Sequence, residues 1–289
     1  MSLDDLEFQY LTGQARPGFP ELHADFAARS LAVVDDVPCE LDLRYGDAER
    51  CTFDYFPVPD GAARGVRGVV AFFHPGYWQW RDKSHFRFIA PTFTALGLDV
   101  ALVNYPLCPT VTLEALTEAV RGAMHVVAAR ARQGAGAAVP LIAAGHSAGG
   151  HLAAEMGLTR WAERGLPDDG SVAGVIALSG LYDIEPLRHT SLDINLKLDA
   201  DSARAASPLL RVHDGAPPAL IAVGADETPA MRAQTERMHA AWLAAGNASE
   251  LLLSDGADHF SLLNQLTTPG TALHAQVAAL IDRALGTGR

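Results

Sequence analysis

A Gly-x-Ser-x-Gly sequence at residues 145–149 joins an apolar run to a helical pattern. The apolar residues 139–144 predict a strand before this turn, and residues 152–158 predict a helix after it. A serine at the tip of such a strand–turn–helix connection is strained so that its hydroxyl stands out above the sheet, and the two glycines let the backbone segments approach each other. This context predicts that Ser147 is a nucleophile rather than an ordinary N-cap serine.

Composition favours one large α/β domain spanning residues 1–289. The chain has 289 residues and is 49% hydrophobic, so it can bury a sizeable core. Its net charge is −12 and it has no run of lysine or arginine, so nucleic acid and anionic membranes are poor partners. No stretch is long and apolar enough for a membrane span. The acidic N-terminus is unlike a signal peptide and the three cysteines are irregularly spaced, so we expect a cytoplasmic protein.

Apolar runs and helical patterns alternate along most of the chain. Residues 1–45 are interpreted as an N-terminal arm over the main body, with one helix at about 20–30, and residues 51–58 as a strand of a leading antiparallel pair. Buried strands are then expected at 65–73, 99–105, 139–144, 172–179, 219–224 and 249–254, and helices at 84–96, 112–132, 152–158, 229–245 and 271–285. This alternation predicts a mostly parallel sheet with helices on both faces.

The segment from residue 181 to about residue 217 loses this alternation. It holds Pro186, Pro208, Pro217 and Pro218 and only short helical patches. We interpret it as a small cap insertion over the carboxyl edge of the sheet, which is where folds of this class bind their ligands.

Three loops at the predicted carboxyl edge carry the side chains of a catalytic triad. Ser147 follows one strand, the neighbours Asp226 and Glu227 follow the strand that ends at residue 224, and His259 follows the last strand. A serine hydroxyl needs an adjacent base, and the base needs a carboxylate that fixes its tautomer. The order nucleophile, acid, histidine is that of α/β-hydrolases. Spacing from the strand allows either Asp226 or Glu227 as the acid.

The loop that begins at His74 predicts an oxyanion hole, a set of N–H donors for the charge that develops on the substrate oxygen. In hydrolases with a His-Gly-Gly segment, N–H groups of this loop act together with the N–H that follows the nucleophile. This assigns Gly76, Tyr77 and Ala148 as donors. Pro75 has no N–H and is excluded.

With these motifs, the chain resembles the kynurenine formamidase (arylformamidase) branch of the α/β-hydrolases, close to carboxylesterases of the hormone-sensitive-lipase type. The resemblance covers most of the chain, and its segments 107–109 and 179–187 are more specific than the Gly-x-Ser-x-Gly turn. The family has Gly-Gly where this chain has Pro75 and Gly76. The matching segments are 45–48, 74–78, 105–109, 111–113, 145–152, 178–187, 207–208 and 258–260.

The resemblance also bears on the acid of the triad. In the similar formamidases, the acid is followed by proline at the second position and by glutamine at the seventh. Glu227 fits this pattern with Pro229 and Gln234, whereas Asp226 is one residue too early. The resemblance therefore implies Glu227, with Asp226 as the alternative because aspartate is the commoner acid.

Aromatic side chains beside the nucleophile indicate the kind of substrate. We expect Tyr77 and Trp78 to line the pocket, with Trp78 as a substrate-binding residue, because an aromatic wall suits an aryl substrate. Asn195 and Leu196 resemble the family's cap, which implies that they close the same pocket.

The resemblance implies a serine hydrolase without cofactor or metal that cleaves the formamide of a small N-formyl aryl amine, N-formylkynurenine first of all. A carboxylesterase for short-chain acyl esters is the main alternative. An amidohydrolase for another formylated heterocycle and a binding protein without activity are the others, and the complete triad disfavours the last. The expected partner is a small-molecule substrate, with no nucleic acid and no membrane, and a homodimer is left open.

Overall fold

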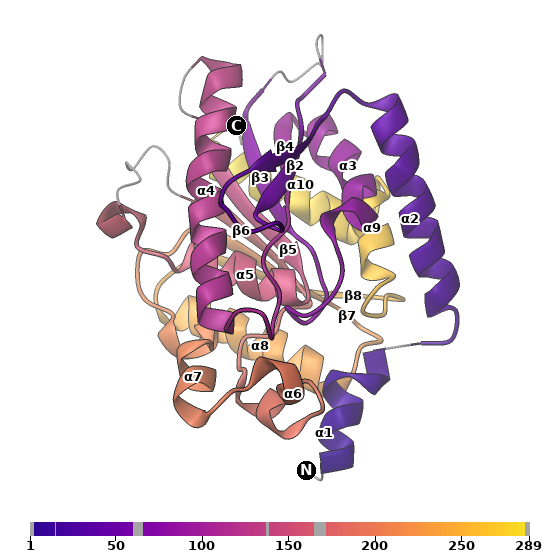
Figure 1. Ribbon diagram of the computed structural model, residues 1–289, viewed down its shortest axis with the longest axis vertical. Coiled ribbons are helices and arrows are strands. Elements are labelled where there is room, and N and C mark those ends of the chain that lie inside the picture. Colours follow the sequence, from indigo (N-terminus) through magenta and orange to yellow (C-terminus); the bar gives the residue numbers. More distant parts are fainter. Residues whose placement is uncertain (1–2, 15, 60–65, 137–138, 165–171, 287–289) are drawn as a thin grey trace.

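One eight-stranded sheet organises the computed structural model, which describes residues 3–14, 16–59, 66–136, 139–164 and 172–286 (Figure 1). Its strand order is β1-β2-β4-β3-β5-β6-β7-β8. The strands are β1 (Glu40–Arg44), β2 (Thr52–Phe56), β3 (Gly68–Phe73), β4 (Leu98–Val103), β5 (Leu141–His146), β6 (Val172–Leu178), β7 (Ala219–Gly224) and β8 (Ser249–Ser254). β2 pairs antiparallel with β1 and β4, and all other neighbours are parallel. The predicted fold class is confirmed.

Helices cover both faces of this sheet (Figure 1). The α-helices are α1 (Leu3–Tyr10), α2 (Phe19–Asp36), α3 (Ala90–Ala95), α4 (Leu113–Ala135), α5 (Ala148–Gly157), α6 (Asp193–Leu196), α7 (Ala200–Ala205), α8 (Pro229–Ala244), α9 (Leu262–Thr267) and α10 (Ala272–Ala284). The 3₁₀ helices are η1 (Thr12–Gln14), η2 (Lys83–Ile89), η3 (Trp161–Arg164), η5 (Glu185–His189) and η6 (Pro208–Arg211). The residues predicted as one helix at 84–96 form η2 followed by α3.

The central strands supply two separate cores because their side chains alternate between the faces. On β3, Val69, Ala71 and Phe73 pack into the core that includes α4, α5 and α8. Val70 and Phe72 pack into the opposite core, with α2, η2, α9 and α10. Every residue of β3 is buried, which explains why this strand is a continuous apolar run rather than an alternating one.

The N-terminal arm contains a helix, α1, that the sequence analysis did not predict. A helix of this length is marginal on its own, so its contacts must stabilise it. The Glu7 carboxylate accepts a hydrogen bond from the N–H of Ser191 at 2.9 Å, and the Gln9 side-chain oxygen accepts one from the N–H of Ala230 at 3.0 Å. These contacts fix α1 beside the insertion and α8, at the end of the molecule where Figure 1 shows α6 and α7.

The insertion between β6 and β7 consists of short helices, η5, α6, α7 and η6. It lies beyond the carboxyl ends of the parallel strands (Figure 1). Ser147 and Glu227 follow the same ends of β5 and β7. None of the helices described in the structure has the length and apolarity needed to cross a membrane.

Candidate active site

Ser147 occupies a strained turn between β5 and α5. Its φ is 57° and its ψ −119°, and its N–H donates to the carbonyl of Leu178 at 2.8 Å. A Cβ on Gly145 would lie 2.1 Å from the carbonyl oxygen of Gly149, and one on Gly149 would lie 1.9 Å from that of Phe73. Both positions therefore need glycine, for the close backbone approach that the sequence predicted.

The structure brings Glu227, and not Asp226, to His259. The Nδ1–H of His259 donates to Glu227 Oε2 at 2.7 Å, and both side chains are buried. The other carboxylate oxygen of Glu227 accepts from the N–H of Gly224 at 2.9 Å and from the hydroxyl of Ser179. Asp226 is exposed. Glu227 is thus a fully bonded buried carboxylate that fixes the tautomer and orientation of the imidazole.

The second nitrogen of His259, Nε2, is buried and has no hydrogen-bond partner within the described residues. His146 stabilises the loop that carries His259. Its Nε2–H donates to the His259 carbonyl at 2.7 Å, and the two ring centroids are 4.6 Å apart. Burial, followed by the proximity of His259, lowers the pKa of His146 well below its usual value of 6.5. His146 is therefore neutral and braces the loop without placing a charge beside His259.

The loop after β3 runs through three consecutive residues of positive φ: Gly76 (132°), Tyr77 (50°) and Trp78 (60°). A Cβ on Gly76 would lie 2.1 Å from the carbonyl oxygen of Trp80, so only glycine fits there. Among the described residues, no backbone carbonyl accepts from the N–H of Gly76, Tyr77 or Ala148. These three predicted oxyanion donors are available for another acceptor.

His74 holds this loop in place. Its Nδ1–H donates to the carbonyl of Pro75 at 2.7 Å, and its ring stacks on that of Tyr105 at 4.3 Å. The Tyr105 hydroxyl donates to the His74 carbonyl at 2.7 Å. Burial lowers the pKa of His74 to about 4, so the ring acts as a neutral brace near pH 7.

Ser147 opens into a cavity of about 160 Å³ with aromatic walls. Phe19, Tyr77, Trp80 and Phe260 supply the rings, and the rest of the lining includes one cation, the Arg81 guanidinium. The described residues contain no cluster of three or more side chains suited to holding a metal ion. Ser147, Gly76 and Tyr77 line this cavity, together with Phe260, the residue after His259. A hydroxyl, free N–H donors and a carboxylate-bound imidazole are the parts that acyl transfer needs.

Trp78 does not line this cavity, although it was expected to contact the substrate. Its side chain is fully buried in the core that includes α4 and α5, and its ring packs edge-on against His151 with centroids 5.0 Å apart. The left-handed turn at Tyr77 and Trp78 sends adjacent side chains to different sides of the loop. Tyr77 and Trp80 therefore form the wall, and Trp80 was not identified from the sequence.

The N-terminal arm supplies a further wall through Leu11, Gln14 and Phe19. The side-chain amide of Gln14 donates to the Thr228 hydroxyl at 3.0 Å, and the Tyr77 hydroxyl donates to the carbonyl of Tyr10. Sequence analysis placed the arm over the body but gave no signal for these contacts, because residues 11–19 have no regular apolar spacing.

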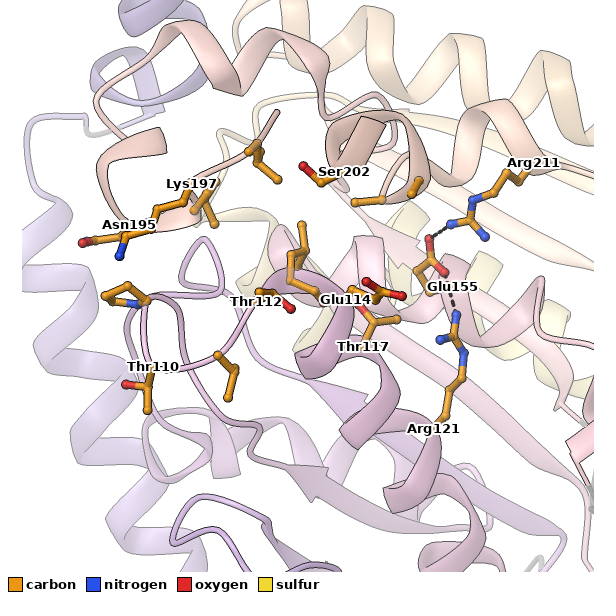
Figure 2. A pocket seen from close by; sticks show the side chains of 17 residues that line it. Thr110, Thr112, Glu114, Thr117, Arg121, Glu155, Asn195, Lys197, Ser202 and Arg211 are labelled. Atoms are coloured by element: carbon orange, nitrogen blue, oxygen red, sulfur yellow. Dashed lines mark hydrogen bonds and ion pairs between the residues drawn. The ribbon is translucent and has the colours of Figure 1, made fainter. Parts of the chain in front are cut away.

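A second and larger cavity, of about 380 Å³, lies between the start of α4 and the insertion (Figure 2). Asn195 and Leu196 line this cavity rather than the one that contains Ser147, contrary to expectation. Figure 2 shows the buried carboxylate of Glu155 between Arg121, 3.1 Å away, and Arg211. Since none of the predicted triad residues lines it, the smaller cavity is the candidate active site.

Comparisons with known proteins identify the fold family of the chain. Residues 70–263 match a family model described as alpha/beta hydrolase fold. The chain is 28% identical over 297 residues to kynurenine formamidase of Danio rerio, covering 98% of each chain. A solved structure from Silicibacter sp. TM1040, provisionally assigned as a thioesterase, is 30% identical with a TM-score of 0.80 over 97% of this chain and 99% of that one. An esterase from Pyrobaculum calidifontis is similar in fold, at 19% identity and a TM-score of 0.69 over 97% of both chains.

Proposed function

The chain belongs to the α/β-hydrolase fold family and is a hydrolase, and on that premise we propose that it cleaves the formamide of a small N-formyl aryl amine with a Ser147–His259–Glu227 triad. The substrate we propose is N-formylkynurenine, which would give kynurenine and formate. The buried hydrogen bond between Glu227 and His259, behind the strained Ser147, is the observation that carries the triad. Similarity to kynurenine formamidases over nearly the whole chain supports the substrate.

In the proposed reaction, Ser147 Oγ attacks the formyl carbon while His259 Nε2 takes the hydroxyl proton. The C–N bond then breaks, and His259 returns the proton to the departing aryl nitrogen. Water, deprotonated by the same imidazole, attacks the formyl ester on Ser147 and releases formic acid and free serine. Glu227 stays ionised and stabilises the imidazolium in both halves of the reaction.

The N–H groups of Gly76, Tyr77 and Ala148 are the proposed donors to the oxyanion. Each donor typically contributes about 100- to 1000-fold to the rate. Pro75 supplies none, so the chain has one glycine N–H fewer than a Gly-Gly loop would offer. The left-handed backbone at Gly76 and Tyr77 supports the assignment, because strained backbone of this kind is found where N–H groups are aimed at a reacting atom.

The cavity supports the proposed substrate class. The four rings of Phe19, Tyr77, Trp80 and Phe260 suit a flat aromatic group, and the volume suits a small molecule. An aryl amine is also an easier leaving group than an alkyl amine, so a triad built like that of an esterase is sufficient for its formamide.

A carboxylesterase for short-chain acyl esters is the second candidate. Pro75 is the observation that favours it, since an ester has a better leaving group than an amide and depends less on a complete oxyanion hole. The specificity constant, kcat/KM, separates the two candidates when N-formylkynurenine is compared with p-nitrophenyl acetate and butyrate. We expect the formamide to be preferred. If either ester exceeds it tenfold, the carboxylesterase replaces the formamidase.

Replacing the nucleophile tests the triad itself. We expect Ser147→Ala to lower kcat by several orders of magnitude, because what remains is catalysis by the oxyanion hole and by binding. The variant should also lose labelling by a fluorophosphonate while its circular dichroism stays that of the wild type. Ser202→Ala, on the exposed α7, is the control and should keep both labelling and turnover. More than about a tenth of wild-type activity in Ser147→Ala would remove Ser147 from this role.

A further inference from the structure

Arg81 is the one charged side chain among the described residues that line the Ser147 cavity. It is half-buried, and burial lowers the pKa of its guanidinium. The proposed chemistry assigns it no part: acyl transfer is complete with the triad and backbone donors. A partly desolvated cation beside a nucleophile therefore calls for another explanation.

The neighbours of Arg81 leave its charge uncompensated. Its Nη1–H donates to His23 Nε2 at 2.6 Å, and its guanidinium carbon lies 5.5 Å from the centroid of the Phe19 ring. His23 must accept this bond, so its Nε2 is unprotonated and the ring is neutral, in agreement with a pKa lowered by burial and then by Arg81. Arg81 takes part in none of the ion pairs found among the described residues.

Other half-buried arginines of this acidic chain do find carboxylates. Arg87 pairs with Asp54 at 2.7 Å, and Arg50 pairs with Asp82 at 3.1 Å. Asp82 is the residue next to Arg81, yet its carboxylate points to Arg50 and to Asn104. In a chain of net charge −12, an available acid adjacent in sequence is thus directed away from Arg81.

The backbone of Arg81 is held in a strained conformation that fixes the side chain against the cavity. Its φ is 75°, in the left-handed region that a non-glycine residue rarely adopts. The guanidinium of Arg50 donates to the Arg81 carbonyl at 2.8 Å and to that of Tyr105 at 3.0 Å, which ties this turn to the loop after β4. Strain of this kind persists only when surrounding contacts determine it, and it collects at ligand sites.

We propose that Arg81 binds a carboxylate at the end of the substrate remote from the reacting carbonyl, so that the enzyme selects aryl substrates that carry a carboxylate over those that lack one. A guanidinium carries five N–H donors, and one is used by His23, so a planar fork remains for a carboxylate. The aromatic walls hold the ring between the two polar ends. This inference rests on the proposed function, because it assumes that the Ser147 cavity holds the substrate.

The wild-type protein tests the inference directly. N-formylkynurenine carries a carboxylate beside its α-ammonium group, and its primary carboxamide keeps the ammonium, the formamide and the leaving group but lacks the carboxylate charge. A charge-assisted hydrogen bond of this type is worth about 10- to 100-fold in binding, so kcat/KM for the carboxylate should exceed that for the carboxamide by that factor. Equal or better turnover of the carboxamide overturns the inference.

Variants then assign the preference to Arg81. Arg81→Met keeps an unbranched stem as far as the position of Nε and removes the guanidinium charge. It should reduce the carboxylate-to-carboxamide ratio to near one, mainly through a higher KM for the carboxylate. Arg81→Lys should restore part of the ratio, because it returns the charge but not the fork. Arg283→Met removes an exposed arginine paired with Glu250 and should leave the ratio unchanged. An unchanged ratio in Arg81→Met overturns the assignment.

An ester pair separates failure of this inference from failure of the proposed function. 3-Acetoxybenzoate and 3-acetoxybenzamide differ by the same charge but need no formamidase activity. Preference for the acetoxybenzoate without formamide hydrolysis would remove the proposed substrate and keep Arg81. Formamide hydrolysis without a preference for the carboxylate in either pair would keep the proposed function and remove the role of Arg81. If Arg81→Met does not fold, the wild-type substrate pairs and Arg81→Lys still test the role of Arg81. Kynurenine should then protect Ser147 from labelling by a fluorophosphonate better than kynurenine carboxamide does. Equal protection by the two compounds would contradict the role of Arg81.

Discussion

At the scale of single residues, the two adjacent carboxylates after β7 have opposite surroundings. Both oxygens of Glu227 are hydrogen-bonded inside the protein, one of them to His259, whereas Asp226 is exposed. We expect Glu227→Gln to lower kcat by up to about 10,000-fold, since the amide can stabilise the wrong tautomer of the imidazole and cannot balance its charge.

Asp226→Asn is the matched control, one residue away and changed by the same chemistry. It should retain most of the wild-type kcat/KM, measured with the same substrate. The opposite order of the two variants would make Asp226 the acid and contradict the hydrogen bond described here.

Side-chain direction separates the site residues that the sequence could indicate from those it could not. Ser147 and His259 follow from motif and spacing, because each stands on a loop after a parallel strand and these strands end at one edge of the sheet. Spacing left Asp226 and Glu227 open, and the resemblance implied Glu227. Trp78 and Trp80 are two positions apart in one loop, and which ring faces the cavity depends on positive φ values that sequence does not reveal.

For other contributors to the site, the sequence does not indicate the role that the side chain has. Ser179 binds Glu227 from the loop after β6, and Gln14 and Phe19 come from the arm. Their roles depend on tertiary contacts between segments more than 40 residues apart in the chain, for example Ser179 with Glu227.

At the scale of elements, α5 and β3 approach each other through a single glycine. We expect Gly149→Ala to destabilise the protein by several kcal/mol and to abolish turnover, because its Cβ would lie 1.9 Å from the carbonyl oxygen of Phe73 and would push the helix away from the sheet. Chemical denaturation and kcat/KM measure the two effects.

Gly122, in the middle of α4, is the matched control because a Cβ there meets nothing within 4 Å. Gly122→Ala should raise the free energy of unfolding by up to about 1 kcal/mol, through helix propensity alone. Equal tolerance of alanine at both positions would contradict the close packing of α5 on β3.

Prediction of whole elements succeeded where local signals were strong. Helix α4 begins where its Thr112 cap predicts, with the hydroxyl accepting from the N–H of Ala115 at 3.2 Å. Helices α1 and α9, of eight and six residues, were missed, because such short helices depend on tertiary packing more than on their own sequence.

At the scale of the whole molecule, three buried histidines make folding sensitive to acid. Burial is the main cause in each case: it lowers the pKa of His74 to about 4 and that of His151 to about 3, and it lowers that of His146 well below 6.5. Below pH 6.5 the unfolded chain therefore binds protons that the folded chain does not. The free energy of unfolding consequently decreases as the pH is lowered. Above pH 6.5 their contribution is complete.

Each histidine contributes a slope of about 1.4 kcal/mol per pH unit, so the three together give about 4 kcal/mol per unit near pH 5. Urea unfolding at pH 7.5, 6.0 and 5.0 measures this slope in a window above the range in which most carboxylates titrate. A constant free energy of unfolding from pH 7.5 to pH 5.0 would show that these rings are not buried as neutral imidazoles.

The walls that Leu11, Gln14 and Phe19 give to the Ser147 cavity have a practical consequence for anyone who reshapes this enzyme. The first twenty residues precede every strand, and of those described only Tyr10 belongs to a buried core, so the sheet can be retained without them. A protein without the first twenty residues could keep the circular dichroism of the full chain and still expose Ser147 to bulk water. Libraries that vary the arm, by contrast, would alter substrate choice at positions far in sequence from the nucleophile, the acid and the histidine.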